Sequence, residues 1–347
     1  MQRLTKYILL SILLIVLTQN IYFDIYRGSA FNVIPHDDYS HYLLYMVGED
    51  EGWLAEPPYT YRVLSVAVAI PFYYVLPVYR FTNLEGKSDN YLRSLEALAL
   101  VFYLSILVGS IFIYKITKNR FGGNETASLI ALLSSYLLFR QTGIYSIDPI
   151  AIMLICVAIY YLKNTLVFSL LMILSIGFNE KILIIFFLLM ISRLIFKKEK
   201  INLISLMPVI SLAIYFIIRI VFYIPGNEAQ IKPGSFLSSM ITNVGYTLSL
   251  KGFFLNILPT LLAVGLYYMS MKEFIIRNDE TKSYFTKADI IPLIGIFIIS
   301  HLINVDYNIG RVSLHCFPLY LPLASIFIVR LLEKNNKPFR SNINQSP

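Results

Sequence analysis

Long apolar runs separated by short polar segments dominate the chain. Many of these runs approach or exceed the roughly 17–25 residues that a helix needs to cross a bilayer. The pattern predicts about ten transmembrane helices, at residues 7–24, 95–116, 125–140, 149–162, 164–177, 181–195, 202–222, 253–271, 289–303 and 316–332. We therefore expect an all-α polytopic membrane protein in which residues 1–347 form a single transmembrane domain.

The segment 62–80, RVLSVAVAIPFYYVLPVYR, fits two structures. It is apolar enough to span the membrane, but Pro71 and Pro77 interrupt it and tyrosines crowd its second half. Because an internal proline removes a helix hydrogen bond and tyrosine favours the membrane interface, the segment also suits a helix lying on the outer surface.

The distribution of Lys and Arg chooses between these structures, because cytoplasmic loops carry an excess of both residues. If 62–80 does not span, 18 of the 29 basic residues face the cytoplasm; if it spans, only 11 do. The first arrangement predicts cytoplasmic N- and C-termini and a first extracytoplasmic loop, 25–94, that contains interfacial helices. It also predicts a second long outer loop, 223–252, and a cytoplasmic tail, 333–347.

Composition supports a membrane protein. The chain is 57% hydrophobic and 14% charged, with a mean hydropathy of +0.65, whereas soluble domains carry about 25% charged residues. Its net charge of +8 would suit nucleic acid, but the basic residues lie in short loops where they orient helices. We expect contact with the bilayer and no nucleic-acid partner. Abundant Ile, Asn and Lys favour a bacterial source, and hence the cytoplasmic (inner) membrane.

Acidic residues concentrate on the predicted outer side. On this topology 14 of the 21 acidic residues face outward. All four histidines, His36, His41, His301 and His315, do so too. Ionisable groups at membrane depth usually mark function, so the asymmetry predicts an extracytoplasmic site.

The stretch PHDDYSHY, residues 35–42, places Asp37 and Asp38 between two histidines shortly after the first predicted span. A carboxylate at the membrane edge suits a general base that accepts a proton from an attacking hydroxyl. The alternative is a solvated helix start in which one of the two is the N-cap. The pattern does not distinguish Asp37 from Asp38.

Arg62 follows two tyrosines, Tyr59 and Tyr61, in the stretch PPYTYR. An interfacial arginine can hold a lipid phosphate with its planar fork of N–H donors. The alternative is an anchor in the aromatic belt with an arginine that reaches out to water.

Two further stretches place charge at predicted outer helix ends. SIDP puts Asp148 at the mouth of a span, where helix capping is the ordinary role. GFNEK puts Glu180 and Lys181 in a turn too short to be merely solubilising. That pair suits a substrate or phosphate contact, or an interfacial ion pair.

NVDYNIGR places Asp306 and Arg311 in the last predicted outer loop. Arg311 beside an anionic lipid would neutralise phosphate charge, and a structural Arg–Asp pair is the alternative.

A metal site has no ligand spacing to support it. His36, Asp37, His41, His301 and His315 are the residues that could converge on a divalent ion. We expect that no cofactor is required. The sequence also lacks a glycine-rich phosphate loop and a nucleophile elbow, which argues against nucleotide hydrolysis and serine-hydrolase chemistry.

These features together resemble the GT-C glycosyltransferases, such as the protein O-mannosyltransferases, the aminoarabinose transferases and the dolichol-dependent glucosyltransferases. The stretch from Pro58 to Leu64 resembles the Pro-Tyr-x-Tyr-Arg-x-Leu stretch of bacterial members. Glu180-Lys181 resembles, in reversed order, the basic/Glu pair that opens a middle helix in that family. Asp306 and Arg311 resemble its late Asp…Arg.

The resemblance implies an inverting transfer of a sugar from a polyprenyl-phosphate donor to a lipid- or glycan-linked acceptor at the extracytoplasmic face. Asp37 or Asp38 would be the base, and Arg62, Lys181 and Arg311 would hold the departing phosphate. The resemblance also implies a set of substrate contacts: His36, His41, Tyr59, Tyr61, Asp148, Glu180 and Asp306. A Wzy-type glycan polymerase or ligase and a transporter or flippase are the alternative functions.

Overall fold

The computed structural model describes residues 37–49, 62–76, 88–142, 148–196, 198–222, 233–275, 287–303 and 313–335. Within these ranges the chain is helical and contains no strand. The all-helical architecture expected from the hydropathy pattern is therefore present.

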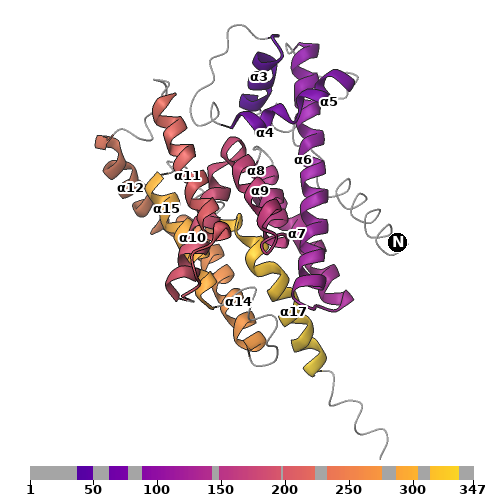
Figure 1. Ribbon diagram of the computed structural model, residues 1–347, viewed down its shortest axis with the longest axis vertical. Coiled ribbons are helices and arrows are strands. Elements are labelled where there is room, and N and C mark those ends of the chain that lie inside the picture. Colours follow the sequence, from indigo (N-terminus) through magenta and orange to yellow (C-terminus); the bar gives the residue numbers. More distant parts are fainter. Residues whose placement is uncertain are drawn as a thin grey trace, which may run out of the picture.

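Figure 1 shows the arrangement of the helices, most of which coincide with predicted apolar runs, whereas the helix Pro233–Thr247 lies within the predicted outer loop 223–252. Their bounds are α3 Asp37–Met46, α4 Val63–Ala67, α5 Ile70–Val75, α6 Asp89–Lys115, η2 Ile116–Arg120, α7 Glu125–Thr142, α8 Asp148–Tyr160, α9 Thr165–Phe178, α10 Glu180–Phe196, α11 Leu203–Val221, α12 Pro233–Thr247, α13 Leu250–Gly252, η4 Phe253–Ile257, α14 Leu258–Ile275, η6 Lys287–Ile290, α15 Ile291–Ile303 and α17 Phe317–Asn335. Elements η2 and η4 are π-helical turns, and η6 is a 3-10 turn.

Polar side chains define where several of these helices start. The Ser88 side chain accepts from the Tyr91 amide at the start of α6, and Asn164 accepts from Val167 at the start of α9. At the start of α11, Asn202 and Ser205 form a reciprocal capping box. Such caps satisfy backbone donors that the first helical turn leaves without partners.

Three helices in the described part of the chain are long and apolar enough to cross a membrane: Asp89–Arg120, Leu203–Val221 and Leu250–Lys272. The structure thus has the features of a helical membrane protein, but it does not support about ten spans. The first predicted span, 7–24, lies outside the described residues.

Several predicted spans are instead helices too short to cross a membrane, and one of them, α8, lies largely inside the bundle. Helices α8, α9 and α15 have 13, 14 and 13 residues, or about 20 Å each, against a hydrocarbon core of roughly 30 Å. Most side chains of α8 are buried. Burial against protein and exposure to lipid both select apolar residues, so hydropathy alone counted these helices as spans.

The ambiguous segment after Arg62 forms two short helices, α4 and α5, which are 5 and 6 residues long. Pro71 lies in the first turn of α5, the one place in a helix where proline is readily accepted. The pair is too short to span, as expected for the interfacial alternative. Helix α4 packs on the end of α9, where a Cβ added to Gly177 would lie 2.7 Å from Leu64 Cγ.

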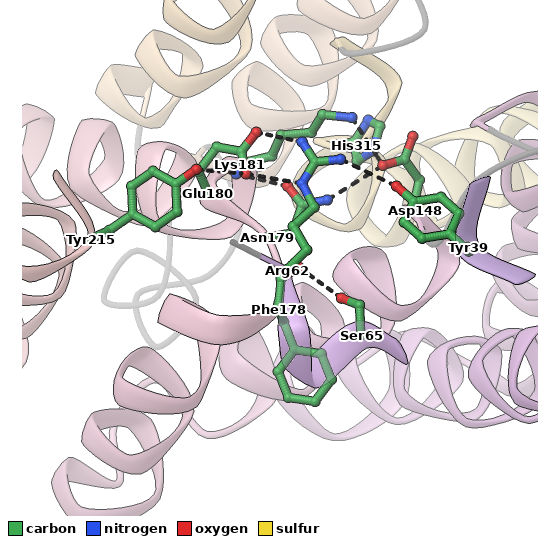
Figure 2. A network of polar contacts seen from close by, with 10 residues as sticks. All are labelled: Tyr39, Arg62, Ser65, Asp148, Phe178, Asn179, Glu180, Lys181, Tyr215 and His315. Atoms are coloured by element: carbon green, nitrogen blue, oxygen red, sulfur yellow. Dashed lines mark hydrogen bonds and ion pairs between the residues drawn. The ribbon is translucent and has the colours of Figure 1, made fainter. Parts of the chain in front are cut away.

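The bundle places α3, α4 and α5 together at one end of the long helix α6 (Figure 1). Helix α6 packs against α7 and α8, α17 lies between α7 and α14, and α10 packs against α9, α11 and α15. The starts of α8 and α10 and the turn before α17 meet beside α4, where a polar cluster lies (Figure 2).

Candidate functional site

A buried ion pair between Arg62 and Glu180 lies at the centre of this polar cluster (Figure 2). Arg62 Nη2 donates to Glu180 Oε1 at 2.5 Å, and Nε donates to Oε2 at 3.2 Å. This two-pronged contact fixes the plane of the guanidinium group. The two residues are 118 positions apart, so the pair joins the start of α4 to the start of α10.

A tyrosine contacts each partner of this ion pair. Arg62 Nη1 donates to the Tyr39 hydroxyl of α3 at 3.4 Å, and the Tyr215 hydroxyl of α11 donates to Glu180 Oε2 at 3.2 Å. Both tyrosines are buried. The Arg62–Glu180 pair is therefore held between α3 on one side and α11 on the other.

A second buried group forms around Asp148, the first residue of α8. Its Oδ1 lies 2.9 Å from Lys181 Nζ, 3.3 Å from His315 Nε2 and 3.5 Å from Asn179 Nδ2. Asp148 and His315 are almost completely buried. One carboxylate oxygen thus gathers groups from the α9–α10 turn and from the turn before α17.

The sequence GFNEK explains how the α9–α10 turn delivers two charges to one place. Asn179 adopts an extended conformation that ends α9, and its side-chain oxygen accepts from the Lys181 amide at 3.0 Å. Helix α10 therefore begins at once, and Glu180 and Lys181 occupy its first turn. The Ser65 hydroxyl donates to the Phe178 carbonyl at 2.7 Å, which fixes α4 to the same turn.

The pair keeps both of its charges. Burial alone would raise the pKa of Glu180, but the charge and hydrogen bonds of Arg62 outweigh it and lower the pKa to about 2. Burial opposes the charge of Arg62 as well, yet the attraction of Glu180 raises the pKa of the guanidinium well above its ordinary value. Glu180 is consequently a fixed anion that orients Arg62.

Basic residues gather at the opposite ends of the helices that begin at this cluster. Lys163 follows α8, Arg193 lies in the last turn of α10, and Lys334 lies in the last turn of α17. The cluster and these basic ends thus lie on opposite sides of the bundle.

The structure brings together four of the predicted site residues, namely Arg62, Asp148, Glu180 and Lys181. Another, His41, packs against Tyr91 of α6 with ring centroids 5.3 Å apart. Asp37 and Asp38 open α3, although their side chains lie outside what the structure describes. The other predicted residues, His36, Tyr59, Tyr61, Asp306 and Arg311, lie outside the described ranges.

Tyr39, Tyr215 and His315 belong to the cluster but were not predicted as site residues, and the same holds for the polar side chains of Ser65 and Asn179. Tyr39 carries no signal among the many tyrosines of the chain, and His315 was considered only as a metal ligand. Tyr215 lies in an apolar helix four positions before Arg219. A tyrosine and an arginine on one face of an apolar helix are the only sequence feature that pointed to a polar contact there. Their contacts come from tertiary packing between distant segments.

The described residues contain no set of side chains that would bind a metal ion. They contain no group of three or more His, Cys, Asp or Glu side chains suited to holding an ion. His301 accepts from the Thr247 hydroxyl or donates to it at 2.8 Å. His36, one of the predicted ligands, is not among the described residues.

Comparison with known proteins yields no relative: the chain matches no family model, no curated protein and no solved structure. The chemistry of the site is therefore argued from its own residues.

Proposed function

We propose that this protein is a bacterial membrane glycosyltransferase of the GT-C type. It moves a sugar from a polyprenyl-phosphate donor to an acceptor hydroxyl at the extracytoplasmic face of the cytoplasmic membrane. The observation that carries the proposal is the buried cluster in which two cations, Arg62 and Lys181, lie at one end of the bundle beside the start of α3. That start carries Asp37 and Asp38.

The proposed reaction is a direct displacement with inversion. Asp37 or Asp38 accepts the proton of the acceptor hydroxyl, whose oxygen forms a bond to the anomeric carbon of the sugar. The bond from that carbon to the phosphate oxygen breaks, and the polyprenyl phosphate leaves with the electron pair. The departing phosphate gains one negative charge, which Arg62 and Lys181 stabilise.

The contacts of Arg62 support this role. Its hydrogen bonds to Glu180 and Tyr39 use one N–H from each of Nε, Nη2 and Nη1, and a guanidinium has five N–H donors. Among the described residues, the other two N–H donors of Arg62 have no recorded protein acceptor, which suits a phosphate oxygen. Glu180 does not suit the role of base, because its pKa of about 2 leaves it a very weak proton acceptor at neutral pH.

The proposed orientation follows from charge. Cytoplasmic segments carry excess Lys and Arg, and the ends of α8, α10 and α17 opposite the cluster carry Lys163, Arg193 and Lys334. We therefore assign those ends, together with both termini, to the cytoplasm. Helices α4 and α5 then lie along the extracytoplasmic surface, where a lipid-borne donor presents its reactive carbon.

The test is a transfer assay with the purified protein, a panel of radiolabelled polyprenyl-phosphate sugars and a mixture of lipid and glycan acceptors. We expect one donor to lose its sugar to an acceptor. Arg62→Gln should slow transfer by about 100-fold or more, since removing one preorganised donor to a developing anion costs roughly 10²–10³ in rate. Lys118→Gln removes a cation at the opposite end of the bundle and should leave transfer unchanged.

Other outcomes would replace the proposal. Transfer that survives unchanged in Arg62→Gln and in Lys181→Gln rejects the phosphate role of the cluster. Consumption of diphosphate-linked glycans alone indicates a polymerase or ligase. Transport of a substrate across the vesicle membrane, with the substrate chemically unchanged, indicates a transporter.

A further inference from the structure

A cluster of cations and aromatic rings lies at the end of the bundle opposite the Arg62 site. Arg120 closes the π-helical turn that follows α6, and its Cζ lies 4.6 Å from the centroid of the Tyr160 ring at the end of α8. Lys115, the last residue of α6, places Nζ 5.1 Å from the centroid of Phe112. These are cation–π contacts, which form when a cation lies over a ring face within about 6 Å.

The rings of this cluster support one another. The Phe112 and Tyr160 centroids are 5.3 Å apart in an edge-to-face arrangement, and Tyr160 and Tyr161 are 5.0 Å apart. The backbone amide of Asn164 donates to the Tyr161 carbonyl at 2.8 Å, which ties the rings to the turn that carries the exposed Lys163. Three cations and three rings therefore share one small region, which we call the basic–aromatic corner.

The local sequence builds this corner. The π turn over residues 116–120 holds one extra residue, and the chain then reverses at Gly122, whose φ of +63° suits glycine. The turn brings Arg120 back toward α8 and away from the axis of α6. π turns often occur at functional positions, and this one gives the guanidinium a flat aromatic support.

An exposed apolar stripe begins beside the corner. Leu166, Leu170, Ile173 and Leu174 on α9 are between 46 and 71% exposed. Their spacing places them on one face of the helix. The stripe starts three residues after Lys163, so a cationic end is continuous with an apolar strip that runs along the bundle.

We propose that the basic–aromatic corner is a binding site for one anionic phospholipid. The headgroup phosphate contacts Lys115, Arg120 and Lys163, the tyrosines lie at the level of the glycerol backbone, and the acyl chains follow the α9 stripe. Arginine both stacks on aromatic faces and recognises phosphate with its planar fork of donors. Tyrosine favours the membrane interface, and an apolar strip of this kind suits acyl chains. The site is independent of the proposed transferase activity and lies at the other end of the bundle.

The test measures thermal unfolding of the full chain in a neutral detergent while phosphatidylglycerol is added, with phosphatidylcholine in a parallel series. A ligand that binds the folded state raises the midpoint as its concentration rises. We expect phosphatidylglycerol to raise it and phosphatidylcholine to have a much smaller effect. Removing the three charges by Lys115→Gln, Arg120→Gln and Lys163→Gln should weaken the apparent affinity by about 100-fold, at roughly fivefold for each charge.

The matched control removes three exposed lysines from the same end of the bundle, as Lys200→Gln, Lys272→Gln and Lys334→Gln. It should keep the response of the wild type to phosphatidylglycerol. If the triple corner variant fails to fold, the double variant Lys115→Gln, Lys163→Gln keeps Arg120 on Tyr160 and should still lose about 25-fold in affinity.

Three results would overturn the proposal. One is an equal response of the corner variant and the wild type to phosphatidylglycerol. Another is a wild-type midpoint that does not distinguish phosphatidylglycerol from phosphatidylcholine. The third is an equal shift with inorganic phosphate alone, because it would mean that the corner binds the anion without the lipid.

Discussion

Lys181 Nζ lies 2.9 Å from Asp148 Oδ1, and this ion pair joins the first turns of two helices, α10 and α8. The side chain of Asp148 is 2% exposed and that of Lys181 is 14% exposed. Burying two charges costs several kcal/mol per ion, which is recovered only when the charges meet in good geometry. The pair is therefore costly to bury, and losing either partner leaves an uncompensated charge in the interior.

Removing one partner of this pair should destabilise the protein strongly. Lys181→Met takes away the cation closest to the buried Asp148 carboxylate, and breaking a buried pair in this way typically costs about 3–5 kcal/mol. Chemical denaturation in detergent micelles measures the free energy of unfolding. The matched control is Lys118→Met, which breaks the more exposed Lys118–Glu125 pair at 2.6 Å and should cost at most about 1 kcal/mol.

A double variant measures the interaction energy between Asp148 and Lys181 apart from the effect of each single substitution. Asp148→Asn combined with Lys181→Met removes both charges and should recover part of the lost stability. If the two single changes simply add, Lys181 and Asp148 are not coupled, and the ion pair contributes nothing specific to this site.

Tyr215→Phe should lower the free energy of unfolding, because it removes the hydrogen bond that joins α11 to the Arg62 site. The change deletes one hydroxyl that donates to the Glu180 carboxylate, and hydrogen bonds to charged groups contribute about 1.5–3 kcal/mol. We expect a loss in this range by denaturation, and a smaller loss of about 0.5–1.5 kcal/mol in a Glu180→Gln background, because the glutamine oxygen still accepts but carries no charge. The control is Tyr74→Phe, because the Tyr74 side chain is 66% exposed. Equal losses at both tyrosines would contradict the role of the hydrogen bond.

Acid should selectively weaken the Arg62–Glu180 pair. The pKa of Glu180 is lowered from 4.5 to about 2 in the folded protein. A lowered folded pKa means that the pair stabilises the protein fully above pH 4.5, and that the stabilisation disappears as the pH falls from 4.5 toward 2. The stability difference between wild type and Glu180→Gln should therefore be constant near neutral pH and shrink below pH 4.5. A difference that stays constant down to about pH 3 would show that Glu180 is not the titrating group.

Much of the fold was predictable because each helix has its own local signal. The apolar runs at 181–195 and 202–222 match the bounds of α10 and α11 to within one residue. Pro71 was a usable local signal for a break in the helix after Arg62, since it lies in the first turn of α5. The number of spans was not predictable in the same way. Hydropathy shows that α8 is apolar, but it does not show whether lipid or protein surrounds the helix. The packing shows that most of α8 is buried in protein.

The site was predictable in part. Glu180 and Lys181 were visible as charges in a turn with no room for a loop, and Arg62 as a cation among tyrosines. Their partners were not visible, because the contacts of Arg62 to Glu180 and of Lys181 to Asp148 cross 118 and 33 positions of chain. His315 reaches Asp148 from a turn just before α17, and nothing in its own neighbourhood indicates that contact.

The close approach of α4 and α9 gives the last prediction, at Gly177. A Cβ at this position would lie 2.7 Å from Leu64 Cγ and 2.8 Å from Leu64 Cδ1. Gly177→Ala therefore requires Leu64, and α4 with it, to move, and inserting a methyl group into a packed contact typically costs about 1–3 kcal/mol. Since Arg62 immediately precedes α4, the same change should also slow the proposed sugar transfer.

Gly265→Ala is the matched control, because a Cβ at Gly265 in α14 meets nothing within 4 Å. Alanine favours a helix over glycine by about 0.5–1 kcal/mol, so this change should be neutral or stabilising. Adding Leu64→Ala to Gly177→Ala removes the side chain that clashes and should restore part of the transfer rate. If Gly177→Ala is as stable and active as the wild type, α4 does not depend on this contact to hold Arg62 against Glu180.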